Sequence, residues 1–121
     1  MSLDATARRR YARQLLLGEI GESGQQRLLD ARFCGEAGGD ADAYAVAADY
    51  LERAGCAADP RGDVLRVPSR SLVMRFAGSP ALAEPAALIL GAFSAVEHLK
   101  EVLGISEAGE LSTDLRLSEE A

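Results

Sequence analysis

The sequence predicts a small α/β domain with three or four short strands and about four helices. The chain has 121 residues, which is enough for one hydrophobic core but not for two. Apolar residues make up 48% of it, as in folded globular proteins. Segments with helical periodicity alternate with short apolar runs bounded by glycine and proline, a pattern typical of α/β domains. We expect the strands to form a mixed or antiparallel sheet, and we leave their order open.

The N-terminal part predicts two helices. Apolar residues at helical spacing predict the first over residues 5–17, with Asp4 or Thr6 as its cap. Gly21 marks a break, and Ser23 or the residue before it begins a second, shorter helix.

The middle of the chain begins with a predicted buried strand in residues 31–39, where glycines then force a turn. The clearest helix follows over residues 40–55. Asp40 or Asp42 stands at its N-terminal end, where a carboxylate is favoured, and Gly55 stands at its C-terminal end.

The next segments predict mainly strands. Residues 57–63 are expected to form a loop, and residues 64–67 and 72–76 two strands of a hairpin. A last strand is predicted over residues 111–117, before an acidic tail. We therefore divide a single domain, 1–121, into an N-terminal helical arm (1–30), a core (31–104) and a terminal strand with its tail (105–121), as the patterns indicate.

A long helix is predicted over residues 85–103, and it is apolar on two sides. One side carries Leu88, Gly91, Ala92, Ala95, Leu99 and Val102, and the other carries Ile89, Phe93 and Val96. Both sides need a cover, and in so small a chain we expect another protein molecule to supply one. Aromatic residues are only 5% of the chain, so its core packs small side chains and a homodimer is favoured over an isolated monomer.

Bulk composition excludes several classes of function. The net charge of −6 argues against nucleic acid as a partner. The longest apolar run, residues 85–96, is too short to span a bilayer, and no apolar run follows the N-terminal arginines, so we expect a cytoplasmic protein without a membrane partner.

Cys34 is expected to be a small buried residue and Cys56 to be more exposed. Neither has a base nearby in the sequence, and no paired CxxC motif predicts a metal.

The opening of the chain resembles the ThiF/MoeB/HesA family, relatives of ubiquitin-activating enzymes. The family pattern R-Y-x-R-Q, then G-x-x-G-Q-x-x-L, then A-R into a first strand, is matched by Arg10, Tyr11, Arg13, Gln14, Leu15, Gly21, Gly24, Gln25, Leu28, Ala31 and Arg32. A late helix of the family is similar to residues 86–105 through Gly91, Ala95, Glu97, Leu99, Lys100, Leu103 and Gly104. The two regions cover under half of the chain. The resemblance implies a shrunken Rossmann-like domain.

In the resembling family, a glycine-rich loop after the first strand holds ATP phosphates. Gly38 and Gly39 remain in that place, but Asp40 and Asp42 stand where phosphate would bind and would repel it. The resemblance also implies that Arg13 reaches a nucleotide in a partner's site, the alternative being a structural arginine. We expect no cofactor; if nucleotide does bind, Arg13, Gly38 and Gly39 are the candidates, with ATP and Mg²⁺.

These observations favour a non-catalytic interaction or scaffold protein that self-associates. It would partner a full-length activating enzyme or a ubiquitin-like or peptide carrier, as inactive halves do in the resembling family. The alternative is a minimal ATP-dependent adenylyltransferase acting on a protein or peptide carboxylate. We assign no catalytic residue, and we place the interface on Tyr11, Leu15, Ile89, Phe93 and Val96.

Overall fold

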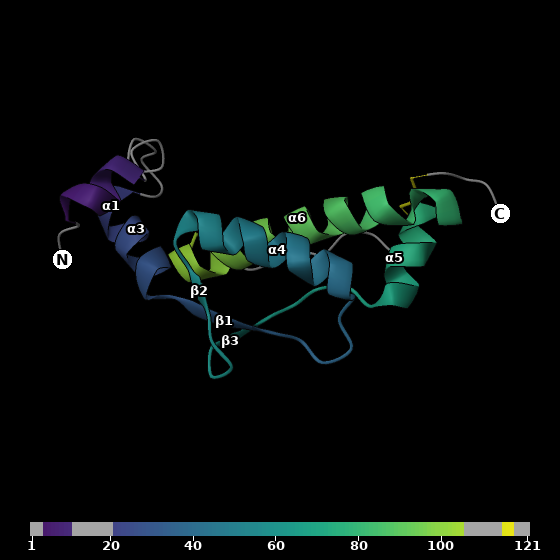
Figure 1. Cartoon of the computed structure of the whole chain (residues 1–121), viewed down its shortest axis with the longest axis horizontal. Helices are drawn as coiled ribbons and strands as arrows, with labels where there is room; N and C mark the ends of the chain where they lie inside the picture. Colours follow the sequence, from purple (N-terminus) through teal and green to yellow (C-terminus); the bar gives the residue numbers. More distant parts are fainter. Residues whose placement is uncertain (1–3, 11–20, 106–114, 118–121) are drawn as a thin grey trace.

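The computed structural model describes residues 4–10, 21–105 and 115–117 of the chain, in a small mixed α/β arrangement (Figure 1). The described elements are, in order, α1 (Ala5–Arg10), α3 (Gly21–Asp30), β1 (Arg32–Gly35), α4 (Ala41–Ala54), β2 (Ala57–Ala58), β3 (Asp63–Leu65), α5 (Arg70–Ala77), a 3-10 turn (Pro80–Leu82) and α6 (Ala83–Leu103).

The three strands form one parallel sheet in the order β2-β1-β3. The expectation of a mixed or antiparallel sheet was wrong, because helix α4 returns the chain to the start of the sheet between β1 and β2. Phe33, in the central strand, is in register with Ala58 on one side and with Asp63 on the other. The chain therefore changes from one side of β1 to the other within residues 59–62. Gly62 makes this possible, because a Cβ atom there would lie 2.5 Å from backbone atoms of Arg32 and Phe33.

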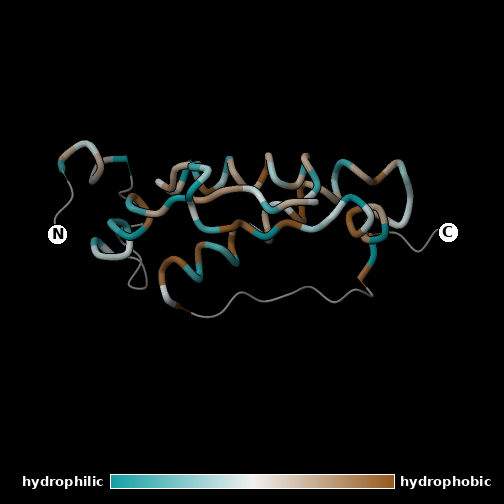
Figure 2. The backbone as a smooth tube through the Cα atoms, turned by 90° about the horizontal axis from the view of Figure 1, so that it is seen from below, coloured by the Kyte–Doolittle hydropathy of each residue, from teal (hydrophilic) through white to brown (hydrophobic). Residues whose placement is uncertain are grey.

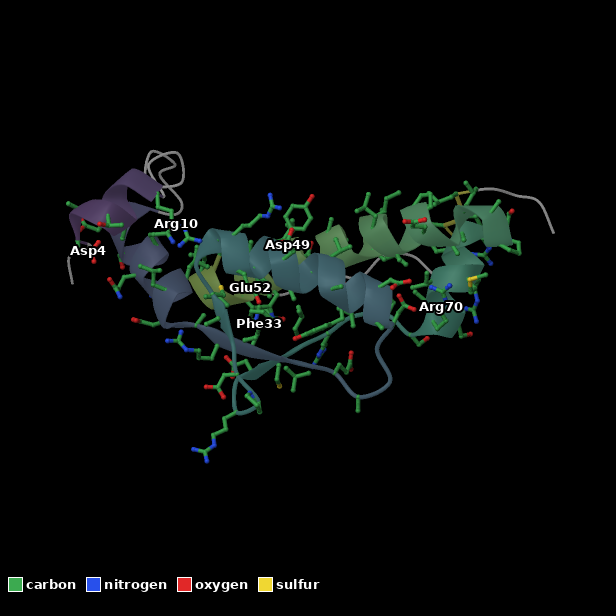
Figure 3. All side chains as sticks on the ribbon, in the orientation of Figure 1. Asp4, Arg10, Phe33, Asp49, Glu52 and Arg70 are labelled. Atoms are coloured by element: carbon green, nitrogen blue, oxygen red, sulfur yellow. The ribbon has the colours of Figure 1, made fainter. Side chains whose placement is uncertain are left out.

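Helices α4 and α6 lie side by side over one face of the sheet (Figure 1). Phe33 points from the sheet into this layer (Figure 3), and both Phe33 and Leu65 are fully buried. Where the two helices touch, Gly91 leaves so little space that a Cβ atom would lie 2.5 Å from the carbonyl oxygen of Ala43. Close backbone approach is thus built into the centre of the domain.

Helix α3 is attached at the C-terminal ends of the two central helices. The buried Gln25 donates from Nε2 to the carbonyl oxygen of Ala54 at 2.9 Å, at the end of α4. Arg27 donates to the carbonyl oxygen of Leu103 at 2.9 Å, at the end of α6. Carbonyls in the last turn of a helix have no partner within the helix, so both bonds satisfy groups that need one.

The ends of α4 match the predictions from the sequence. Asp40 is the N-cap, with its carboxylate accepting from the N–H of Ala43, and Gly55 ends the helix in the left-handed conformation at φ 118°. The predicted strand after Ala31 and the second N-terminal helix are also present, as β1 and α3. Of the first predicted helix, residues 5–10 are helical and the remainder lies outside the described residues.

The predicted hairpin is wrong in its second half. Residues 70–77 form helix α5, because Ser69 accepts from the N–H of Leu72 as an N-cap and Val73 and Ala77, four residues apart, are buried on one face. The expected loop at residues 57–63 instead contains β2 and the start of β3.

The terminal strand predicted over residues 111–117 is also wrong for the three of its residues that the structure describes. Residues 115–117 form no strand, and the N–H of Leu117 donates to the carbonyl oxygen of Phe76 at the end of α5. Residues 111–114 lie outside the described part of the chain.

Candidate functional site

The turn between β1 and α4 occupies the place that the resemblance assigns to a phosphate loop. Gly38 has a φ of 82°, a conformation that glycine adopts without strain. Gly39 lies against Val67, and a Cβ atom there would come within 2.5 Å of that side chain. The N–H of Asp40 donates to the carbonyl oxygen of Pro68 at 2.8 Å. The turn is therefore packed against the segment that follows β3.

The N-terminus of α4 is occupied by a carboxylate of the chain itself. Asp40 is only 5% exposed, and its Oδ2 accepts from the N–H of Ala43 at 2.9 Å. Arg70 on α5 faces this end of the helix and lies 3.3 Å from Asp40 Oδ1 and 3.7 Å from Asp42 Oδ2 (Figure 3). The positive end of the helix dipole and the guanidinium both act on Asp40, and the N–H that Asp40 occupies is one an anionic ligand would use.

The candidate nucleotide residues are only partly placed by the structure. Gly38 and Gly39 share this turn, whereas Arg13 lies outside the described residues. Sequence reasoning missed Arg70, because only the fold brings α5 to the start of α4. Its role was hidden by the wrong expectation of a strand over residues 72–76.

The two cysteines have the reverse of their expected environments. Cys56 is buried, and burial raises the pKa of its thiol to about 11, against a smaller opposing effect of Arg32. Cys34 is half-buried, and its thiol donates to the carbonyl oxygen of Gly62 at 3.2 Å. Cys56 is covered because the chain turns back under α4 immediately after Gly55. A protonated, buried thiol is a poor nucleophile.

His98 is buried on the inner side of α6. Burial lowers the pKa of its imidazole, while Glu101 and Asp63 act in the opposite direction. Within residues 4–10, 21–105 and 115–117, no three His, Cys, Asp or Glu side chains come together in a group that could hold a metal ion.

The outer face of α6 carries several exposed apolar residues. Leu88 is 55% exposed, Ile89 43% and Val96 53%, while Ala92 and Phe93 between them are half-buried. No charged residue occurs from Pro85 to Val96, and hydrophobic residues run along the helix in Figure 2. We call Leu88, Ile89, Ala92, Phe93 and Val96 the α6 outer face. A helix surface facing water normally carries polar residues.

The expected interface residues are placed in part. Ile89, Phe93 and Val96 lie on the α6 outer face, and Tyr11 and Leu15 lie outside the described residues. The expectation that Leu88 lies on the same side of α6 as Gly91 was wrong, because Leu88 is exposed and Gly91 is buried. The buried side consists mainly of small residues together with one leucine and His98, namely Ala86, Ala87, Leu90, Gly91, Ser94, Ala95 and His98.

Comparisons with family models, curated proteins and solved structures find no match for this chain. Among the helices described, none is by itself long and apolar enough to cross a membrane. One pair, α5 with residues 80–103, passes that test on length and composition but is bent by 110°.

Proposed function

We propose that the protein is a non-catalytic interaction protein that self-associates through the α6 outer face. The observation that carries this proposal is the exposure of Leu88, Ile89 and Val96 on a helix stretch without a single charge. Contiguous exposed apolar patches of this kind are typical of protein–protein contacts. Burying them against another molecule removes apolar surface from water.

The start of α4 supports the non-catalytic part of the proposal. An incoming phosphate would have to displace Asp40 from the N–H of Ala43 while Asp42 stands beside it. Displacement would also break the contact between Asp40 and Arg70 and leave a buried carboxylate without that partner. Both effects disfavour ATP at this turn.

The parallel sheet, with α4 joining β1 to β2, supports the finer assignment of a shrunken Rossmann-like fold. Its strand order agrees with a reduced nucleotide-binding unit, but helices cover one face and β2 joins β3 through four residues. On this proposal the chain is a pared-down relative of the ThiF/MoeB/HesA family. A full-length activating enzyme or a ubiquitin-like or peptide carrier is then a further partner class.

Light scattering coupled to size exclusion tests self-association. We expect the wild-type chain to run as a dimer at tens of micromolar, and Val96→Lys to run as a monomer because it places a charge in the apolar contact. Ala45→Lys is the matched control, since it puts the same side chain on an exposed position of α4. A monomeric wild-type chain, or equal effects of both substitutions, contradicts the proposal.

Titration calorimetry with ATP and Mg²⁺ tests the absence of nucleotide chemistry. We expect no heat of binding at millimolar ligand. Saturable binding that is lost in Gly38→Val would favour the adenylyltransferase alternative. Binding unchanged by Gly38→Val would place the nucleotide elsewhere on the chain.

A further inference from the structure

We draw no further inference here: the strongest candidate, the face of the parallel sheet turned away from α4 and α6, where Cys34 is half-buried beside the exposed Val64, carries none, because nothing in the described part of the chain shows what covers it.

Discussion

The two sides of α6 differ in side-chain size: the buried side carries mainly small residues and the exposed side carries large apolar ones. The side against α4 carries mainly small residues such as Gly91 and Ala95, whereas the side facing out carries Leu88, Ile89 and Val96. Small residues inside allow the α4 and α6 backbones to come close, since a Cβ atom at Gly91 would lie 2.5 Å from the Ala43 carbonyl oxygen. Large apolar side chains on the outer side leave apolar surface exposed to water, which is energetically unfavourable. The inner side therefore holds the domain together, and on the proposed function the outer side serves association.

Truncation of Leu90, on the inner side of α6, is expected to have the largest effect on stability. Leu90 is 4% exposed, so Leu90→Ala removes buried methyl groups and leaves a cavity. We expect the free energy of unfolding to fall by about 2–5 kcal/mol. Urea denaturation followed by circular dichroism measures it. A loss below about 1 kcal/mol would mean that the inner side of α6 does not carry the core.

Adding one methyl group at the helix contact is expected to have the next largest effect. In Gly91→Ala the new Cβ would lie 2.5 Å from the Ala43 carbonyl oxygen and 2.8 Å from Val46 Cβ. The helices must move apart, and we expect a loss of about 1–3 kcal/mol despite the better helix propensity of alanine. The same urea experiment applies. Stabilisation by Gly91→Ala would show that α4 and α6 are less closely packed than described.

The inner side is also expected to respond to pH through His98. Burial lowers the pKa of this imidazole below its ordinary value of 6.5, so the unfolded chain binds the proton first as the pH falls. The contribution of His98 to stability is therefore complete above that value and declines below it. We expect the decline between about pH 7 and pH 5 to be smaller in His98→Gln than in wild type. If the free energy of unfolding depends on pH equally in both proteins, His98 does not contribute to the pH dependence of stability.

The smallest effect on stability is expected on the outer side. Leu88 is 55% exposed, and Leu88→Ala is expected to change the free energy of unfolding of dilute protein by less than about 0.5 kcal/mol. On the proposed function it nevertheless weakens self-association, which light scattering at several concentrations detects. A large loss of stability in dilute protein would mean that Leu88 is covered within its own chain.

Local signals in the sequence were sufficient to predict the boundaries of some helices. The extent of helix α4 could be predicted, because a carboxylate at its N-terminal end and Gly55 at its C-terminal end act through their immediate neighbours. The end of α6 at Gly104, in the left-handed conformation, has the same origin. The structure decides between the two carboxylates expected at the start of α4, since Asp40 is the cap and Asp42 lies in the first turn. The short run at residues 72–76 could not be assigned by pattern alone, since four apolar residues and one arginine fit a strand or a helix equally well.

The candidate sites show the same division. The sequence placed Ile89 and Val96 on a second apolar side of the helix, but it grouped Leu88 with the buried Gly91. Leu88 and Gly91 are three positions apart, so they point about 60° away from each other and the edge of the buried side falls between them. The contact of Arg70 with Asp40 joins residues 30 positions apart, and the expectation of a strand in place of α5 concealed it.

The sequence by itself determined where α4 and α6 end, the uncharged stretch from Pro85 to Val96 and the carboxylate that begins α4. These depend on neighbours within a few residues of each other. Tertiary structure alone decided the parallel order of the strands, the passage of Gly62 across β1 and the burial of Cys56 and His98. Each of these depends on contacts between segments far apart in the chain, whose geometry no local pattern specifies.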